Sequence, residues 1–269
     1  MIVDFHTHTL HSDGTQTPAQ LLRLLDARGV SRLAITDHDA LEAYAQLDLE
    51  AQVKRVITGV EINTTYRHNE VHILGYGFPL DSPVLRPALE RNNAERQLRV
   101  RVMAERLTSA GYELSVEEIQ AESLPGSPLG RPHVARALMR KGHVGTIEGA
   151  FRTLLRRGGP GYVPSTYIRP HEAIRLVRES GGVAVLAHPG RLDDYEIIEE
   201  LTGVGLQGLE VFYPSHDANQ RAYFRETAAR LGLVMTGGSD FHDPTYNQHG
   251  VGMDVDERDL EGFFELLGS

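Results

Sequence analysis

Short apolar segments alternate with helical segments at both ends of this 269-residue chain, and this alternation limits the folds open to it. A strand start at Ile2 is followed by a helix with Thr17 and Pro18 at its beginning and Gly29 at its end. Helices are also expected near 39–51 and 193–201. Runs typical of buried strands occur at 2–5, 33–36, 56–62, 71–77, 183–187, 208–212 and 233–236. About seven strands in βα alternation predict an α/β barrel of parallel strands.

The middle of the chain follows a different pattern. From residue 81 to residue 167 one helical segment follows another, which predicts a helical insertion domain. Residues 1–80 and 168–269 would then form the barrel. Between Arg86 and Arg169 there are 14 Lys and Arg against 8 Asp and Glu, whereas the rest of the chain has 13 against 29. A basic segment in an acidic chain indicates one place for an anionic ligand, although solvated arginine-rich helices give the same pattern.

Composition and charge exclude several kinds of bond, ligand and partner. The chain has no cysteine, so disulfides are excluded and any metal must be bound through nitrogen and oxygen. A formal charge of -10 argues against general affinity for nucleic acid. No apolar run approaches the roughly 18 residues of a membrane span, and no signal segment precedes the first strand. We therefore expect a cytoplasmic protein without a membrane or stable protein partner.

Histidines and carboxylates recur where the predicted strands end. In a parallel barrel these ends meet at one face, so the side chains should converge there. His6 and His8 also point to the same side of their strand, because alternate residues do so. Imidazole and carboxylate together suit Mn, Fe or Zn, with Mn favoured here. The candidate residues are His6, His8, Asp13, Asp37, His38, Glu61, His72, His188, Asp240 and His242.

The motifs around these residues resemble those of a known family. FHTHTLHSDG, ITDHD, GVEI, VHILGY, LAHPG and GGSDFH are similar, in this order, to the motifs of the PHP (polymerase and histidinol phosphatase) family. The segment GRPHVARALMRKG resembles a subgroup of nucleoside 3′,5′-bisphosphate phosphatases and RNase AM-type 5′-to-3′ exoribonucleases. The resemblance implies a distorted (β/α)7 barrel with a helical insertion.

The resemblance also implies two or three divalent ions in defined ligand sets. One set would be His6, His8, Glu61 and Asp240. A second would share Glu61 and add His72 and His188, and a third would use Asp13, His38 and His242. His11 is an alternative to Asp13, and Asp4 and Asp37 are candidates for orienting ligands, although Asp37 is equally suited to capping the following helix.

Such a centre suits phosphoester hydrolysis. Three divalent ions and three carboxylates would leave about three positive charges, which favours a phosphate dianion. A hydroxide bridging two ions would serve as the nucleophile, since metal coordination lowers the pKa of water to roughly 7. Glu61, Asp240, His188 and His242 are expected to carry the catalysis.

Substrate contacts are expected from the helical segment and from one later loop. Arginine matches phosphate oxygens with a two-pronged fork. The resemblance of GRPH to the subgroup implies Arg131 and His133 as candidates for a second phosphate, with Ser127 and His216 as weaker ones, although Arg131 could also simply flank the helix that Pro132 starts. Arg96, Arg99, Arg101 and Arg106 alternate with acidic residues on one helix and are interpreted as a solvated face.

These features favour hydrolysis of the 3′-phosphate of a nucleoside 3′,5′-bisphosphate, and of short 5′-phosphorylated oligoribonucleotides as a further substrate. Histidinol phosphate or another small phosphomonoester is the alternative substrate. A metal-binding module without catalysis is a second alternative.

Overall fold

The structure is a computed structural model that describes residues 1–49, 55–67, 69–245 and 247–268. Eight strands belong to one sheet in these residues. They are β1 (Ile2–Asp4), β2 (Arg32–Ile35), β3 (Val56–Tyr66), β4 (Asn69–Tyr76), β5 (Val183–Leu186), β6 (Gly208–Phe212), β7 (Val234–Gly237) and β8 (Met253–Asp254). Seven of them match the predicted strands, and the short β8 was not predicted.

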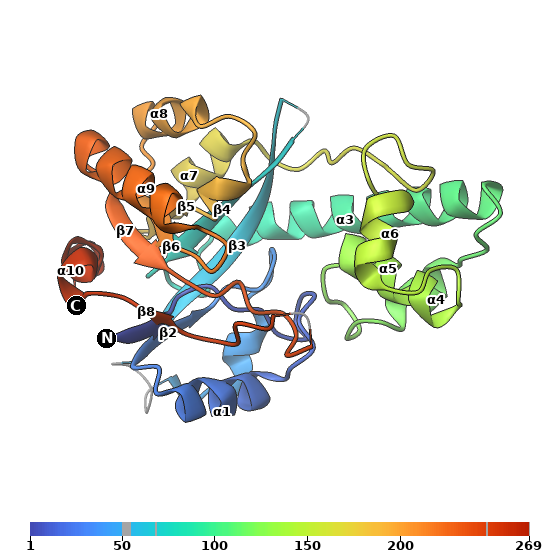
Figure 1. Cartoon of the computed structure of the whole chain (residues 1–269), viewed down its shortest axis with the longest axis horizontal. Coiled ribbons are helices and arrows are strands. Elements are labelled where there is room, and N and C mark those ends of the chain that lie inside the picture. Colours follow the sequence, from blue (N-terminus) through green and yellow to red (C-terminus); the bar gives the residue numbers. More distant parts are fainter. Residues whose placement is uncertain (50–54, 68, 246, 269) are drawn as a thin grey trace.

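Helices surround this sheet and also form a separate group beside it (Figure 1). Around the sheet lie α1 (Pro18–Arg28), α7 (Pro170–Glu179), α8 (Glu196–Gly203), α9 (Ala218–Leu231) and α10 (Glu257–Leu266), with short 3-10 turns η1 (Glu42–Gln46) and η2 (Pro189–Arg191). Beside it lie α3 (Leu85–Ser109), α4 (Val116–Gln120), α5 (Arg131–Arg140) and α6 (Ile147–Thr153). Of the helix expected near 39–51, the described residues show the 3-10 turn η1 and a helical residue at Leu49, and residues 50 and 51 lie outside the described residues.

The strand order is β7-β6-β5-β4-β3-β2-β1-β8, and the chain just beyond β1 closes the barrel against β7. There Phe5 donates its backbone N–H to the carbonyl of Gly237 at 3.0 Å, and Asp240 donates to His6 at 2.8 Å. The prediction of an α/β barrel of the (β/α)7 type is confirmed. The expectation that all strands are parallel is wrong, because β4 is antiparallel to both β3 and β5. β3 and β4 form a hairpin, so the beginning of β4 lies at the end of the barrel where its parallel neighbours finish.

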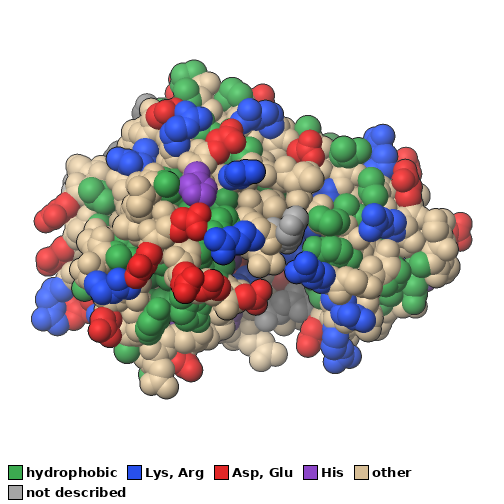
Figure 2. Space-filling view, turned by 90° about the horizontal axis from the view of Figure 1, so that it is seen from above, with side chains coloured by type: hydrophobic (Ala, Val, Ile, Leu, Met, Phe, Trp, Pro, Cys, Tyr) green, Lys and Arg blue, Asp and Glu red, His purple; other side chains and the backbone are tan. Residues whose placement is uncertain are grey.

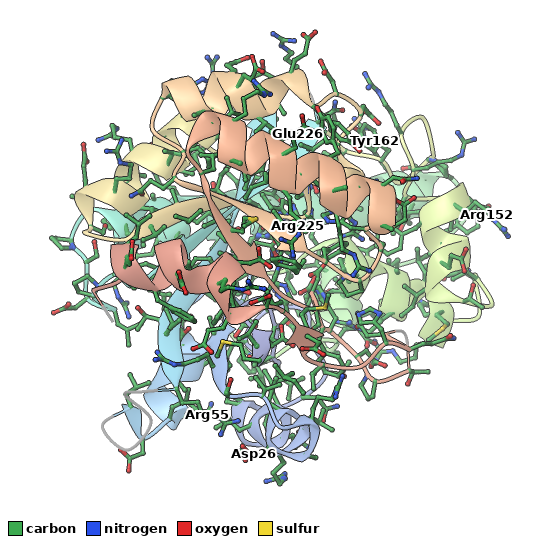
Figure 3. The ribbon with its side chains drawn as sticks, turned by 60° about the vertical axis from the view of Figure 1, so that its left-hand side comes forward. Asp26, Arg55, Arg152, Tyr162, Arg225 and Glu226 are labelled. Atoms are coloured by element: carbon green, nitrogen blue, oxygen red, sulfur yellow. The ribbon has the colours of Figure 1, made fainter. Side chains whose placement is uncertain are left out.

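The residues predicted to begin and end the first helix, α1, do so in the structure. The Thr17 side chain accepts a hydrogen bond from the backbone N–H of Gln20, and the Gln20 side chain accepts one from the backbone N–H of Thr17. Both backbone donors at the start of α1 are therefore satisfied. Gly29 ends it at φ +76°, a left-handed conformation that favours glycine. Arg55, just before β3, pairs with Asp26 of α1 at 2.5 Å (Figure 3) and so links helix and sheet.

Two hydrophobic clusters form the interior. The larger one fills the barrel and the space under its helices. The smaller one contains Met103, Leu107, Ile119 and Leu138 and lies among α3 to α6. α3 contributes to both clusters and runs from the sheet to the other helices (Figure 1). The division of the chain into domains at residues 80/81 and 167/168 therefore stays a prediction.

A buried polar network joins α3 to the barrel. Arg96 Nε donates to Asp39 Oδ2 at 2.8 Å, and Asn92 Nδ2 donates to Asp39 Oδ1 at 2.9 Å. Asp39 also accepts the backbone N–H of Asn63 on β3 at 3.1 Å, and Arg96 donates to the amide oxygen of Asn63. The side chains of Asp39 and Arg96 are 0% and 5% exposed. The interpretation of Arg96 and Arg99 as solvated is wrong for these two, since they turn into the interface, whereas Arg101 and Arg106 are exposed as expected.

In the described part of the chain no helix is long and apolar enough to cross a membrane.

The buried pair predicts a large loss of stability when one partner is removed. Arg96→Met should lower the free energy of unfolding by about 3 to 5 kcal/mol, because Asp39 would remain as an uncompensated buried charge. Urea unfolding measures this loss. The double variant Asp39→Asn/Arg96→Met should lose less free energy of unfolding than Arg96→Met alone, because it leaves no buried charge at Asp39. As a control, Arg91→Met breaks an exposed pair with Glu172 and should change the free energy by less than about 1 kcal/mol. Equal losses for the two arginine variants would contradict the prediction.

Candidate metal centre

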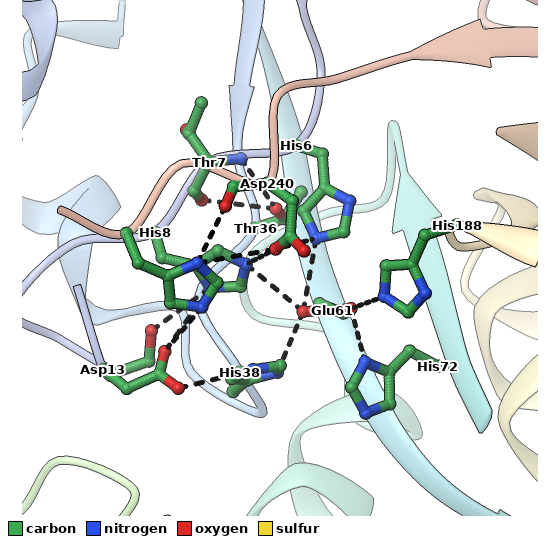
Figure 4. A network of polar contacts seen from close by, with 12 residues as sticks. His6, Thr7, His8, Asp13, Thr36, His38, Glu61, His72, His188 and Asp240 are labelled. Atoms are coloured by element: carbon green, nitrogen blue, oxygen red, sulfur yellow. Dashed lines mark hydrogen bonds and ion pairs between the residues drawn. The ribbon is translucent and has the colours of Figure 1, made fainter. Parts of the chain in front are cut away.

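All nine predicted metal ligands meet at one end of the barrel, and all of them except His242 are labelled in Figure 4. They come from the loops after β1, β2, β5 and β7 and from the strands β3 and β4. His72 joins them from within β4 because that strand runs in the opposite direction. All are buried except His72 and His242, which are partly exposed. They are His6, His8, Asp13, His38, Glu61, His72, His188, Asp240 and His242.

Glu61 lies at the centre of this group. Its Oε1 is 2.7 Å from His72 Nδ1 and 3.1 Å from His188 Nε2. On the other side, its Oε2 is 3.3 Å from His6 Nε2, 3.2 Å from His8 Nε2 and 2.9 Å from His38 Nδ1. One buried carboxylate thus faces five imidazoles, with its two oxygens directed to different ones.

Asp240 and Asp13 extend the group on either side of His8. Asp240 Oδ1 is 3.4 Å from His6 Nε2 and 3.2 Å from His8 Nε2. Asp13 Oδ1 lies 3.2 Å from His242 Nε2, and Asp13 Oδ2 lies 3.7 Å from His38 Nε2. The arrangement places Asp13, and not the alternative His11, inside the group; His11 instead contacts Gln46.

Three sets of ligand atoms are close enough to share an ion, with all atoms of a set within 4.8 Å of one another. The sets are His6, His8, Glu61 and Asp240; His8, Asp13, His38 and His242; and His38, Glu61 and His72. The first equals the set implied by the family resemblance, the second adds His8 to the implied one, and the third has His38 in place of His188. Because a neutral imidazole offers one lone pair, His8 and His38 can each serve one set at a time.

The donor atoms fit divalent ions. His6 Nε2, His8 Nε2, His38 Nδ1 and Glu61 Oε2 are buried and make no hydrogen bond with the described residues. Buried polar atoms are normally hydrogen-bonded, so four such atoms aimed at common points require another partner. Imidazole nitrogens and carboxylate oxygens are the ligands that Mn, Fe and Zn accept.

The pKa shifts of the ligands also indicate that the buried carboxylates require positive charge close to them. Burial lowers the pKa of His8, but the carboxylates of Asp240, Glu61 and Asp13 outweigh it and raise the pKa to about 10. For Glu61 burial raises the pKa, and the surrounding imidazoles reverse this and hold the pKa well below its usual range. The carboxylates thus favour positive charge at His6 and His8, whereas burial lowers the pKa of His38 and His188. A metal ion bound to the nitrogens of His6 and His8 would take the place of their protons.

A second layer of residues orients the ligands, and most of it could not be identified from the sequence. Glu210 accepts from His6 Nδ1 at 2.9 Å and from the backbone N–H of His188 at 2.7 Å. Tyr213 and Arg191 donate to Asp240 Oδ2 at 2.9 and 3.0 Å, which leaves Oδ1 for the centre. Such contacts fix the tautomer and direction of a ligand.

The two acidic candidates for orienting ligands act on the backbone and hydroxyl groups of loops. Asp4 accepts the backbone N–H and hydroxyl of Ser239 at 2.8 and 2.7 Å, and thus holds the loop that carries Asp240. Asp37 accepts the backbone N–H of Thr9 at 2.7 Å and the hydroxyl of Ser12 at 2.6 Å. Asp37 therefore shapes the loop between His8 and Asp13, and the structure gives it no capping role.

Strained backbone supports the assignment of function to this place. His188 has φ +29° and Asp240 has φ +52°, values that residues other than glycine rarely adopt. Such conformations persist only where the surroundings enforce them, and they concentrate at active sites.

A cavity of about 690 Å³ lies between the centre and the group of helices α3, α5 and α6. Its lining includes the ligands Asp13, Glu61 and Asp240 on the barrel side. Five arginines also line it, namely Arg96, Arg99, Arg131, Arg136 and Arg191. The basic excess of the middle segment is thus partly directed at the metal centre.

Of the four predicted substrate contacts, only Arg131 lines this cavity. His133 is fully buried, accepts the backbone N–H of Gly130 at 3.0 Å and donates to the Ser12 carbonyl at 3.1 Å, so it fastens α5 to the loop carrying Asp13. His216 has both ring nitrogens engaged by the backbone of Gly190 and Val211 and so supports the turn after His188. Ser127 faces the carbonyl of Leu10 at 3.4 Å. In the described part of the chain these three side chains contact the protein's own backbone, and their role in substrate binding stays a prediction.

An α/β barrel with imidazoles and carboxylates gathered at one mouth defines a metal-dependent hydrolase. The model of the PHP domain family matches residues 4–162. The chain belongs to this family and is a metal-dependent phosphoesterase.

Relatives with different substrates cover most of the chain. A phosphoribosyl 1,2-cyclic phosphate 1,2-diphosphodiesterase of Eggerthella lenta is 37% identical over 90% of this chain and 94% of the relative. The 5′-3′ exoribonuclease Rnm of Salmonella typhimurium is 34% identical over 91% of this chain and 86% of its own. A 3′,5′-nucleoside bisphosphate phosphatase of Chromobacterium violaceum is 33% identical over 93% of this chain and 90% of its own.

Solved structures agree with the fold. An amidohydrolase from Chromobacterium violaceum with bound sulfate superimposes with a TM-score of 0.89 at 31% identity, covering 99% of this chain and 96% of the other. A protein from Bifidobacterium adolescentis assigned as a metal-dependent phosphoesterase gives 0.82 at 32% identity, covering 89% and 87%.

The central position of Glu61 predicts a combined loss of metal and activity. Glu61→Gln keeps the size of the side chain but removes its charge and one acceptor oxygen. We expect at least one fewer bound ion per chain and a loss in kcat of about a hundredfold or more, since even residues that only orient ligands are worth 10- to 100-fold. Metal analysis of the purified protein and an assay with added Mn measure both. Glu172→Gln, on the surface, should change neither; full metal content in Glu61→Gln would refute the bridging role.

The buried position of His133 predicts a dependence of stability on pH. Burial lowers the pKa of His133 to about 4, below the roughly 6.5 of the unfolded chain, so the unfolded state takes up a proton first as the pH falls. The contribution of His133 is complete above pH 6.5 and is lost between about pH 6.5 and 4. From pH 7.5 to 4.5 the wild type should lose about 2 to 3 kcal/mol more than His133→Asn in urea unfolding. Parallel pH profiles for the two proteins would exclude this role.

Proposed function

We propose that the chain hydrolyses a phosphoester on a ribose that carries a second phosphate, with the 3′-phosphate of a nucleoside 3′,5′-bisphosphate as the leading substrate. The observation that carries this proposal is the cavity whose one wall is the metal centre and whose other wall is lined by arginines of α3 and α5. A substrate with one phosphate would use only the first wall.

The three relatives support a common substrate class. Their names specify a nucleoside bisphosphate, an RNA and a phosphoribosyl cyclic phosphate, and each contains ribose with more than one phosphoryl linkage. The cyclic diester is the second candidate substrate, because the diesterase relative is 37% identical to this chain. Histidinol phosphate lacks both the ribose and a second phosphate, so the arginine wall argues against it.

Long RNA fits the surroundings less well than a mononucleotide. A second cavity of about 370 Å³ adjoins the first and shares Glu70, Val71, Arg191 and Leu192 with it. Its further lining contains four carboxylates, Asp193, Asp194, Glu196 and Glu200, which would repel a phosphate backbone. Basic and acidic side chains are also interspersed over the face in Figure 2, without a continuous basic track there.

In the proposed mechanism the ligand residues would hold two or three ions, with Mn favoured, and these ions would supply Lewis acidity and a water of lowered pKa. Glu61 would bridge the ligand sets through its two oxygens. Asp240, held by Tyr213 and Arg191, would keep Oδ1 directed at His6 and His8. His188 and His242 would complete the centre at the mouth, and Arg131 would hold the second phosphate.

A substrate panel with added Mn tests the proposal. A nucleoside 3′,5′-bisphosphate should have a kcat/KM about tenfold or more above that of the matching nucleoside 3′-monophosphate, because charged hydrogen bonds to the second phosphate are worth about 1.5 to 3 kcal/mol. The panel should include a short 5′-phosphorylated RNA, a 5-phosphorylated ribose 1,2-cyclic phosphate and histidinol phosphate. Highest activity on histidinol phosphate, or equal rates with and without the 5′-phosphate, would overturn the proposal.

A further inference from the structure

A carboxylate and two arginines form a compact group in the wall of the active-site cavity. Glu70, at the beginning of β4, accepts from Arg99 Nη1 at 2.6 Å through Oε1. Through Oε2 it accepts from Arg131 Nη2 at 2.9 Å. The side chains of Glu70 and Arg99 are 17% and 8% exposed, and that of Arg131 is 34% exposed. One acidic group therefore serves two basic groups that come from different helices.

This sharing distinguishes the group from the other ion pairs of the cavity. Arg96 pairs with Asp39 and Arg191 pairs with Asp240, so each of these carboxylates serves one arginine. Arg136 donates to the backbone carbonyl of Asp13 at 3.1 Å. Arg99 and Arg131 have only Glu70 between them among the described residues. The group consequently contributes a net charge of about +1 to the lining of the cavity.

The donors of the two arginines are used to different extents. Arg99 also donates to the carbonyl of Val163 at 3.0 Å and to the hydroxyl of Tyr167 at 3.1 Å, so it is fixed in place. Arg131 donates only to Glu70 within the described part of the chain, and its guanidinium lies 5.7 Å from the ring centre of Phe151. Since a guanidinium has five N–H donors, Arg131 retains several for a ligand in the cavity.

We propose that Glu70 is a built-in counter-anion that limits how tightly the subsite of Arg99 and Arg131 holds the second phosphate. This inference rests on the proposed function. Without Glu70 the subsite would have a charge of +2 and would retain a phosphate dianion, including the one that stays on the product. With Glu70 the charge is reduced to +1 and both guanidinium groups stay aligned, so a second phosphate is recognised and the product is still released.

Glu70→Gln tests this by removing the charge while keeping the shape. With the Mn-loaded full-length protein, calorimetry should show adenosine 5′-monophosphate binding on the order of tenfold more tightly than to the wild type, as expected for one buried charge fewer in the subsite. Binding of adenosine, which lacks the phosphate, should not change. In the assay, the KM of the nucleoside 3′,5′-bisphosphate should fall while that of the nucleoside 3′-monophosphate stays the same, and inhibition by adenosine 5′-monophosphate should increase.

Glu172→Gln is the matched control, because Glu172 pairs with Arg91 at 2.6 Å on the surface and outside the cavity. It should change none of these values. Unchanged or weaker binding of adenosine 5′-monophosphate to Glu70→Gln would overturn the proposal, as would an equal change for adenosine. Either result would make Glu70 a structural link between β4 and the helices.

Glu70→Met covers the case that Glu70→Gln does not fold, as judged by circular dichroism. Methionine also removes the charge with a side chain of similar length, so adenosine 5′-monophosphate should again bind on the order of tenfold more tightly while adenosine does not; wild-type affinity in a folded Glu70→Met would then overturn the proposal. Failure of the proposed function is a separate result, because it requires the wild type itself to treat substrates with and without the 5′-phosphate equally.

Discussion

The carboxylate of Glu61, buried among five imidazoles, is the interaction on which the rest of the structure depends. A single negative charge in this position is stable only if positive charge surrounds it, and the imidazoles supply that charge through bound protons or bound ions. The ligands must come from separate strands, because no single segment could place five rings around one carboxylate. The barrel satisfies this demand, since it brings the ends of its parallel strands, and the beginning of the reversed strand β4, to one mouth.

The group of helices acts as the second wall of the site, and it is held to the barrel by charge as well as by apolar packing. Asp39 and Arg96 fix the middle of α3, while His133 fastens α5 to the loop between His8 and Asp13. The same helices present Arg99 and Arg131 to the cavity. His133, a predicted substrate contact, thus helps to fix the position of α5 and with it the cavity residue Arg131.

The barrel and the ligand positions could be predicted because each depends on a local pattern. Apolar runs mark strands, and a histidine or carboxylate directly after such a run must lie at the strand end. The antiparallel course of β4 could not be predicted this way, since a strand has the same local pattern in either direction. Nor could the burial of Arg96 and Arg99 be foreseen: their spacing with glutamates is that of a solvated helix, and only the partners Asp39 and Glu70, remote in sequence, reverse it. Glu210, Tyr213 and Arg191 lack any motif and become meaningful only through their contacts.

The closure of the barrel between the chain after β1 and the chain after β7 has a consequence for biosynthesis. His6 and Asp240 lie side by side through a backbone hydrogen bond, although most of the chain separates them. A chain emerging from the ribosome therefore has its first two histidines long before the carboxylate that completes their ligand set. Contacts of such long sequence separation form late in folding. The nascent chain is thus unable to complete this ligand set, and with it the first metal site, until the segment that carries Asp240 has been made.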